Sequence, residues 1–467
     1  MIYDIHTGDD LYGRLAQLAP GDEVVVHAGT YPSPGFVQVT WAGTAGSPIV
    51  IHAAPGEHVV LQGTFAQNLL NIDGSYWTFQ GFEITGASHG LRLHQVDHAT
   101  IQDNVIHDVG DVGISCNFEP DSCDSVSIIH NEIYRTGMDT AGGATGEGMY
   151  LGCNNAACLF TNGLVANNYV HDTGGAQGDG IEIKTGAHDN IVRDNVIIRT
   201  IYPGITMYGF AGAGSSNIVE RNLVWHTMDN GIQVVGQIVV RNNIVLDAAA
   251  AGLDSKPSQN TVPTNVTFQD NTVVGNGTCL HADSWSTETG QAVENNALYC
   301  QAGAAIDIVG GPGNGATITT NIGLGTSTAA TGFAQGGSVA TDLGAPTTGN
   351  VYPPPGSALI GAAGGAQPVD DFNASPRTHH DVGAYDVSGP TNPGWIVVEG
   401  FKTVPAAEPD APMNEGPTDP GGPGGTKSPS GCGCQGSDPT SLLVLLTWWS
   451  GRWSRNRWRN RRRRRPR

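Results

Sequence analysis

The feature that most constrains the fold of this chain is an internal repeat, in which an Asn stands just before an apolar or strand-forming pair. Nine such Asn recur between residues 102 and 324, at spacings of 27, 37, 27, 27, 21, 28, 25 and 25 residues. A period of this size is typical of a solenoid, in which each repeat is one coil that buries its apolar side only against its neighbours. The repeating residues are Asn104, Asn131, Asn168, Asn195, Asn222, Asn243, Asn271, Asn296 and Asn321.

The period fits a coil of three short strands, because each strand needs about four to six residues and each corner a few more. Asn suits a corner, since it tolerates left-handed backbone geometry and bonds to nearby backbone. Stacked Asn side chains of successive coils are expected to bond to one another as a ladder. The sequence therefore predicts an all-β right-handed parallel β-helix. A leucine-rich repeat would need a leucine framework, which the sequence does not show.

A second column of residues fixes the register of the coils, because a Gly followed by an apolar residue comes after successive repeating Asn. These Gly are predicted to begin the next strand of each coil. Side chains alternate along a strand, so Ile181 and Ile183 are expected to point inward, and Glu182 and Lys184 outward. The members of the column are Gly113, Gly148, Gly180, Gly204, Gly231 and Gly252.

The segments on either side of the repeat set the domain boundaries. Residues 11–18 predict a short amphipathic helix that caps the open end of the core, as a solenoid requires. The Asn column stops near residue 325, and residues 375–386 are expected to close the solenoid. We predict a β-helix over residues 1–390, a disordered Pro/Gly-rich linker over 391–440, and a short apolar stretch with an Arg-rich tail over 441–467.

Charge is divided unevenly along the chain. The formal net charge is −21, yet residues 441–467 hold ten Arg and no acid, so the remaining chain carries 12 basic and 43 acidic residues. Such an acidic body argues against nucleic acid as a partner, because phosphate binding needs a basic surface. It is compatible with bound Ca²⁺, which takes carboxylate oxygens. A soluble acidic surface without a ligand is the alternative.

Six of the eight Cys lie in the body as three close pairs. We predict the disulfides Cys116–Cys123, Cys153–Cys158 and Cys279–Cys300, with buried free thiols as the alternative. Disulfides indicate an oxidising compartment, hence a secreted or cell-surface protein. Residues 1–19 lack the apolar stretch of a secretory signal, so we expect that a signal peptide is missing from this sequence.

The repeat resembles that of the right-handed parallel β-helix superfamily, which includes pectate lyases. The segments LAPGDEVVVHAGTY (18–31) and GTAGSPIVIHAAPGEHVVLQG (43–63) are similar to the start of the chondroitinase B and alginate lyase family. That resemblance implies a Lys base, a nearby Arg, and Ca²⁺ held by acidic residues. Lys184, in IEIKTGAHDNIVRDN (181–195), matches the base. No Arg stands one coil further on, where the chain has Thr206, Met207 and Tyr208.

The C-terminal tail resembles the sorting tags of myxobacterial surface proteins, in which a Cys motif, an apolar stretch and an Arg cluster follow one another. Cys432, Cys434 and the terminal Arg carry this resemblance. The apolar stretch, residues 442–449, is far shorter than the roughly 20 residues that span a bilayer. The tail therefore reads as a degenerate tag, and no membrane-spanning segment is predicted.

Stacking the Gly column brings residues of successive coils side by side, about 4.8 Å apart. One face then gathers carboxylates, a base and aromatic rings, the mixture that a saccharide groove needs. Its members are Glu147, Asp179, Glu182, Lys184, Tyr150, Tyr208 and the nearby His171. Gln233, Asp254 and Lys256 continue the face, and with Tyr150 they are predicted to bind substrate. The 37-residue spacing before Asn168 adds a loop beside this face.

The chemistry predicted for this face is β-elimination of a uronate. Glu147, Asp179 and Glu182 would hold Ca²⁺, which neutralises the substrate carboxylate. Lys184 would be the base, with Tyr208 or His171 as proton donor. We therefore predict an extracellular, monomeric, carbohydrate-active protein that cleaves an acidic polysaccharide. The alternative function is non-catalytic polysaccharide binding or adhesion at a cell surface.

Each candidate residue also has a structural interpretation. Lys184 and Glu182 would form a surface ion pair. Glu147 and Asp179 would cap turns, and the tyrosines would be ordinary strand residues. The pair His171-Asp172 recurs as His107-Asp108 at the same coil position, which favours a structural role at a corner.

Overall fold

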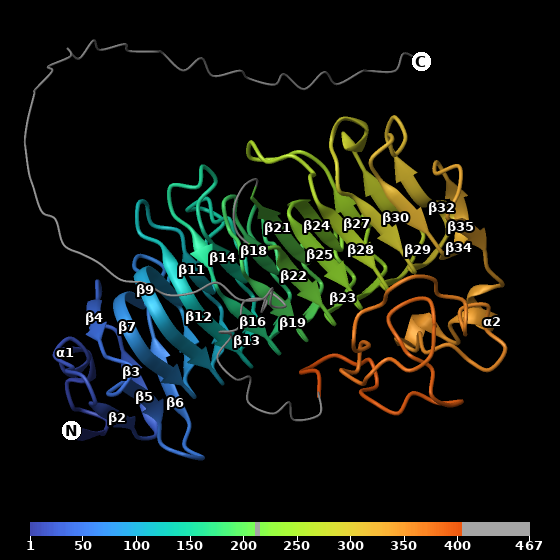
Figure 1. Cartoon of the computed structure of the whole chain (residues 1–467). Helices are drawn as coiled ribbons and strands as arrows, with labels where there is room; N and C mark the ends of the chain where they lie inside the picture. The colour runs from blue at the N-terminus through green and yellow to red at the C-terminus, as the bar shows by residue number, and fades with distance from the viewer. Residues whose placement is uncertain (211–214, 404–467) are drawn as a thin grey trace, which may run out of the picture. The chain divides into compact units, whose positions relative to one another are not determined.

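The computed structural model describes residues 1–210 and 215–403. Met1–Glu408 forms one compact unit, in which the chain winds into stacked coils (Figure 1). The paired strands that follow one another through the stack are parallel, and each coil adds a strand to each of three faces. The predicted parallel β-helix is therefore confirmed. We call the three faces sheets I, II and III, in the order in which the chain runs through them: sheet I before the repeating Asn, sheet II after it, and sheet III at the Gly column.

Sheet I precedes the repeating Asn, and sheet II follows it. Sheet I contains β1 (Ile2–Ile5), β2 (Glu23–Val26), β5 (Ile49–Ala53), the second parts of β7 (Leu70–Gln80), β9 (Leu91–Gln102) and β12 (Cys123–Ile129), then β16 (Leu164–Ala166), β19 (Ile191–Arg193), β22 (Asn217–Glu220), β25 (Ile238–Arg241), β28 (Val266–Gln269), β31 (Ala292–Glu294) and β33 (Thr317–Thr319). Sheet II contains β3 (Gly29–Pro32), β6 (Val59–Gln62), β8 (Glu83–Thr85), β10 (Val105–His107), β13 (Glu132–Tyr134), β17 (Tyr169–His171), β20 (Val196–Ile198), β23 (Leu223–Trp225), β26 (Ile244–Leu246), β29 (Thr272–Gly275), the first part of β32 (Ala297–Ile308), β34 (Asn321–Ser327) and β35 (Phe333–Gln335).

The strands of sheet III begin at or near the position of the Gly column. It contains β4 (Gln38–Ala42), the first parts of β7 and β9, β11 (Ile114–Cys116), β14 (Met149–Leu151), β18 (Ile181–Ile183), β21 (Ile205–Gly209), β24 (Ile232–Gly236), β27 (Ala251–Ser255), β30 (Thr278–Ala282) and the end of β32. The two-residue β15 (Phe160–Thr161) pairs with the start of β12 at the corner between sheets III and I. A 3₁₀ turn, η1 (Trp285–Thr287), follows β30.

The predicted asparagine ladder lies at the corner between sheets I and II. From Asn104 to Asn296, each Nδ2 donates to Oδ1 of the ladder Asn in the next coil, over 2.9–3.1 Å. The left-handed residue that we expected at the Asn is instead the residue before it, such as Asp194 (φ 57°) or Arg221 (φ 56°). Because the chain turns at the residue before the Asn, the Asn side-chain amide lies inside the corner, where its hydrogen bonds are shielded from water.

The Gly column reflects close contact between successive coils. A Cβ at Gly180 would lie 2.5 Å from the carbonyl oxygen of Gly204 and 2.5 Å from Cγ2 of Ile197. Both distances are shorter than atoms can approach, so a side chain at this position would force the coils apart. Beyond the Gly, Ile181 and Ile183 are fully buried, as the alternation predicted.

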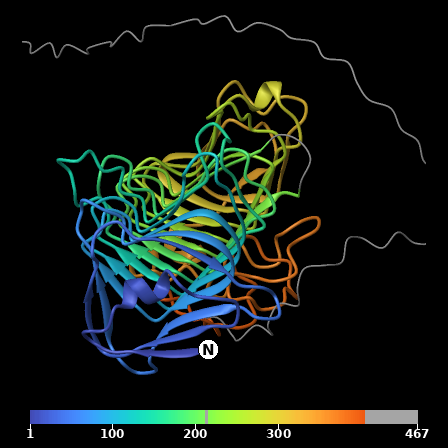
Figure 2. The same cartoon turned by 90° about the vertical axis from the view of Figure 1, so that its left-hand side faces the viewer.

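The N-terminal end of the core is capped by α1 (Leu11–Leu15), as expected from the sequence. Leu11, Tyr12 and Leu15 are buried in the core, and Nε1 of Trp41 donates to the carbonyl of Leu15 at 2.9 Å. Figure 2 shows α1 at this end of the stack. Strand β1 precedes the helix and pairs with β2, which the sequence did not predict because β1 buries a single residue and shows no clear alternation.

Residues 336–403 form a layer over the outer side of sheet II, through α2 (Val339–Asp342), the 3₁₀ turn η2 (Pro346–Thr348) and irregular chain (Figure 1). Phe372, Tyr385 and Trp395 pack against side chains of β20, β23 and β26. Lys402 is buried at the end of the layer, where Nζ donates to Asp194 and to two carbonyls. The packed chain thus continues past residue 390, where we had placed the boundary of the linker. Residues 404–467, which include the rest of the predicted linker and the tail, lie outside the described residues.

The three predicted disulfides are confirmed. Cys116 bonds Cys123, Cys153 bonds Cys158, and Cys279 bonds Cys300. Within the described chain, no helix is long and apolar enough to cross a membrane.

Candidate functional site

The predicted face lies on the outer side of sheet III. The strand register aligns Tyr150 with Glu182, and Glu182 with Thr206. It continues from Thr206 to Gln233 and from Gln233 to Asp254. The spacing of the Gly column therefore gave the correct order of these side chains along the stack.

Three acidic side chains meet at the start of β14 and β18. One carboxylate oxygen from each of Glu147, Asp179 and Glu182 lies within 4.8 Å of the others. Glu147 and Asp179 stand directly before Gly148 and Gly180, where hydrogen bonds from Gly148 N to the Asp179 carbonyl at 2.9 Å and from Met149 N to the Gly180 carbonyl at 3.0 Å tie the two coils together. Among the described residues, three such groups of possible metal ligands occur, and this is the one whose members are all buried.

The three buried carboxylates have too few hydrogen-bond donors around them to pair every oxygen. Thr145 Oγ1 donates to Glu147 at 2.6 Å, and Thr206 Oγ1 donates to Asp179 at 2.5 Å. Glu147 Oε1 and Glu182 Oε2 are buried without a hydrogen-bond partner. Burial, reinforced by the charge of Glu182, raises the pKa of Glu147 to about 8 and the pKa of Asp179 well above its usual range. Unpaired carboxylate oxygens in a group of three fit a divalent cation such as Ca²⁺.

Lys184 lies against this carboxylate cluster and is not the surface ion pair that we considered. Its Nζ bonds Glu182 Oε1, and the whole residue is 3% exposed. The ammonium also lies 4.3 Å from the ring centroid of Tyr150 and 5.3 Å from that of Tyr208. Burial, with the nearby charge of Glu182, raises the pKa of Tyr208 above its usual range, so that its hydroxyl keeps its proton at neutral pH.

Two loops meet next to Lys184. Residues 256–264, which we call the roof loop, turn back through a bridge between Ser258 and Thr261. Thr261 Oγ1 bonds Thr185 Oγ1 at 2.6 Å. Gln259 Nε2 donates to Asn154 Oδ1 at 3.1 Å, which joins the roof loop to the loop closed by Cys153 and Cys158. The sequence gave no signal of this contact, since it joins residues 105 positions apart outside the repeat.

The residues predicted to bind substrate form a second polar group further along sheet III. Asp254 bonds Lys256 Nζ at 2.9 Å and His281 Nδ1 at 2.6 Å. Asn230 Nδ2 donates to Gln233 at 3.0 Å and reaches Asp254 at 3.3 Å. His281 escaped sequence reasoning because the Gly column ends at Gly252, which left its strand without a marker.

His171 does not join the carboxylate cluster. It lies on β17 in sheet II, where Nδ1 bonds Asp172 at 2.7 Å and Nε2 bonds Glu132 at 3.2 Å. Its ring stacks on Tyr134 at 4.8 Å and on Tyr169 at 4.2 Å between centroids. His107 makes the equivalent bonds to Asp108 and Glu83. These repeated contacts match the structural role that the recurrence favoured.

Comparisons with known proteins agree with the geometry of the coils. Residues 7–168 match the family model of the Pel9A-like right-handed β-helix region, and residues 208–298 match that of the right-handed β-helix region. A comparison with curated proteins finds no match.

Several solved structures are similar to this chain. The crystal structure of pectate lyase Pel9A is 16% identical with a TM-score of 0.51, over 82% of this chain and 96% of that chain. The complex of XylC with xylose is 11% identical with a TM-score of 0.56, over 83% of this chain and 98% of that chain. An alginate lyase from Paenibacillus sp. str. FPU-7 is 22% identical with a TM-score of 0.42, over 62% and 95%. Two family models of right-handed β-helix regions and a stack of coils shared with pectate lyase Pel9A agree that this chain folds as a right-handed parallel β-helix.

Proposed function

We propose that this protein is an extracellular, cation-dependent polysaccharide lyase that cleaves an acidic polysaccharide by β-elimination. The observation that carries the proposal is the buried carboxylate cluster, with Lys184 held between it and two tyrosine rings on the outer side of sheet III. Three disulfides support an oxidising, extracellular setting. The shared fold of pectate lyase Pel9A agrees with a polysaccharide substrate.

Glu147, Asp179 and Glu182 are the residues that would hold the cation. When bound there, a divalent cation neutralises the carboxylate of the uronate and makes the proton on its C5 more acidic. Glu182 would then be shared between the cation and Lys184, so its ion pair with Lys184 would be weaker. The side chain of Lys184 would then turn from an ion pair to the substrate.

The elimination itself needs one base and one acid. The Lys184 ammonium would first give one proton to water. Its Nζ then takes the proton from C5, and the electron pair of that bond forms the double bond between C4 and C5. The bond from C4 to the glycosidic oxygen breaks, and the leaving oxygen takes the proton of the Tyr208 hydroxyl. Transfer of a proton from the Lys184 ammonium to the Tyr208 oxygen restores the starting state.

A second candidate function is non-catalytic binding of an acidic polysaccharide. The observation that favours it is the burial of Lys184, which is 3% exposed, beside a roof loop that is bonded to Thr185 and Asn154. In that case the carboxylate cluster would stabilise the coils, and sugar would be bound along the exposed part of sheet III.

The test uses the full chain with pectate, alginate and chondroitin sulfate in the presence of Ca²⁺, followed by the ultraviolet absorbance of the unsaturated product. A lyase gives a signal that chelator abolishes. Lys184→Arg keeps the positive charge beside Glu182 but removes the base, so activity should fall to background. Lys256→Ala, on the same face, should raise KM and leave kcat nearly unchanged.

The outcomes separate the two candidates. A signal that survives Lys184→Arg would exclude Lys184 as the base. Absence of product from every polysaccharide, combined with retention of one of them on the immobilised protein, would exclude the lyase and leave the binding function.

A further inference from the structure

Arg92 occupies the same outward column of sheet III as the site around Lys184. The register aligns Arg92 with Ser115, Ser115 with Tyr150, and Tyr150 with Glu182. Three steps of a parallel stack correspond to roughly 14 Å along the face. Arg92 thus lies on the surface that a polysaccharide bound at Lys184 would follow toward the N-terminal coils.

The guanidinium of Arg92 has no ion pair or hydrogen bond among the described residues. Its Nε is buried without a partner, and the side chain as a whole is half-buried. The acid that acts on it most, Asp111, is already bonded by the backbone N and Oγ1 of Thr145 and by Gly146 N. Arg135, Arg199, Arg221 and Arg241 are each paired with a carboxylate, as an acidic body would favour.

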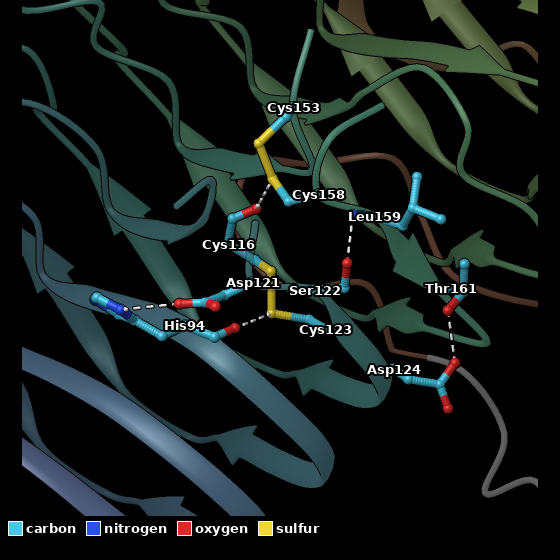
Figure 3. Close-up of a disulfide and its surroundings, with 10 residues drawn as sticks. All are labelled: His94, Cys116, Asp121, Ser122, Cys123, Asp124, Cys153, Cys158, Leu159 and Thr161. Atoms are coloured by element: carbon cyan, nitrogen blue, oxygen red, sulfur yellow. Dashed lines mark hydrogen bonds and ion pairs between the residues drawn. A yellow bond between two sulfur atoms is a disulfide. The ribbon is translucent and has the colours of Figure 1, made fainter. Parts of the chain in front are cut away.

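A disulfide loop holds Arg92 in place. Phe118, in the loop between Cys116 and Cys123, has its ring centroid 5.3 Å from the Arg92 guanidinium and 4.4 Å from the His94 ring. Figure 3 shows the disulfide that closes this loop and Asp121 turned toward His94, at 3.5 Å. The loop therefore fixes the guanidinium by a cation–π contact while leaving its remaining N–H donors without partners.

We propose that Arg92 binds a carboxylate of the polysaccharide and so forms a distal anionic-sugar subsite. The inference rests on the proposed function, which places an acidic chain along sheet III. A guanidinium presents a planar fork of donors that matches a carboxylate, and an unpaired Arg in an acidic body is predisposed to bind an anionic ligand. The separation from Lys184 means that short fragments reach one site only, whereas longer ones reach both.

The experiment measures binding by titration calorimetry in the Lys184→Arg background, so that the ligand is not cut. The probes are disaccharides and hexasaccharides prepared from pectate and from alginate, with Ca²⁺ present. Arg92→Gln should raise the dissociation constant of the hexasaccharide about tenfold, the value of one charge-assisted contact, and leave that of the disaccharide unchanged. Arg92→Lys should restore part of the affinity, because it returns the charge without the fork.

Arg14→Gln is the matched control. Arg14 also lies over an aromatic ring, 4.2 Å from the centroid of Tyr3, but belongs to the capping helix. It should leave both affinities unchanged. Phe118→Leu changes an exposed loop residue, so it keeps the fold even if Arg92→Gln does not. It should weaken hexasaccharide binding through the loss of support for Arg92.

In the Lys184→Arg background, equal affinity for the hexasaccharide with and without Arg92→Gln would overturn the subsite. An equal loss of affinity for both probes, or failure of the Lys184→Arg protein to bind either probe, would overturn it too. The lyase proposal is judged separately by formation of product. Hexasaccharide binding that depends on Arg92 without any turnover would retain the subsite and reject the lyase.

Discussion

Replacement of Glu147 by Gln tests the charge state of the carboxylate cluster. Burial and the charge of Glu182 raise the pKa of Glu147 from 4.5 to about 8 in the folded protein. The folded state then binds a proton more tightly than the unfolded chain does. The stabilisation is complete below pH 4.5 and is lost as the pH rises to about 8. The difference between these two values corresponds to about 5 kcal/mol of unfolding free energy.

The assay is urea unfolding of the full chain between pH 5 and pH 8.5, in chelator and in excess Ca²⁺. In chelator, the unchanged protein should lose stability steadily toward pH 8.5. Glu147→Gln, which is neutral and of the same shape, should lose about 4 kcal/mol less over this range. Excess Ca²⁺ should stabilise the unchanged protein by about 3 kcal/mol at a hundredfold excess over its dissociation constant, and the variant much less.

The quantity to be measured is the difference in pH dependence between Glu147→Gln and the unchanged protein. The pH profile of the unchanged protein alone is not enough, because other groups titrate in the same pH range. Asp270, for example, is also buried, and burial raises its pKa to about 7. Glu119→Gln, an exposed side chain in the loop between Cys116 and Cys123, should leave the pH dependence as it is. Parallel pH profiles for Glu147→Gln and the unchanged protein, with no response to Ca²⁺, would refute both the raised pKa of Glu147 and the cation site.

Three further changes test other parts of the structure. Asn195→Ala removes four hydrogen bonds of the ladder and should cost about 4 kcal/mol in urea unfolding, whereas the exposed Asn276→Ala should cost under about 0.5 kcal/mol. Gln259→Ala removes the hydrogen bond between the roof loop and Asn154. The loss of about 1 kcal/mol should raise the fraction of molecules with an open roof loop about fivefold and tighten polysaccharide binding by the same factor. Unchanged affinity would show that the loop does not limit access. Replacing Cys279 and Cys300 by Ala opens a larger loop than replacing Cys153 and Cys158, so the loss of stability should be about 3 kcal/mol against about 2 kcal/mol.

The periodic parts of the molecule could be predicted because the same contact is made once in every coil. A ladder Asn such as Asn195 must bond the Asn before and after it, so its residue type and spacing recur along the sequence. Gly180 recurs for a steric reason of the same kind. Since both columns fix which residue lies above which, they also placed Glu147, Asp179 and Glu182 together before any coordinate was known.

Contacts that occur only once in the molecule leave no repeating pattern in the sequence. The layer of residues 336–403 meets sheet II through apolar side chains that follow neither a strand nor a helix period, and Lys402 reaches Asp194 from 208 residues away. The roof loop is a single excursion of the same kind. For His171, the repeat correctly predicted that the same position recurs in other coils. It did not reveal that the strand of His171 belongs to sheet II, so His171 was wrongly grouped with the residues of sheet III.

The arrangement of the carboxylate cluster follows from the same steric rule that builds the coils. Because Gly148 and Gly180 allow their backbones to pack in contact and hydrogen bonds join the two coils there, the residues just before them stack, and in this chain both are acids. A solenoid that needed only stability would place uncharged residues there, since like charges at this spacing oppose folding when buried. Two acids kept at such a position, with Glu182 beside them and two of the carboxylate oxygens unpaired, are best explained by a cation that binds between the coils. Under the proposed function, the cost in stability and the role in catalysis have a single origin, so the pH dependence of unfolding and the response to Ca²⁺ should change together when Glu147 is replaced.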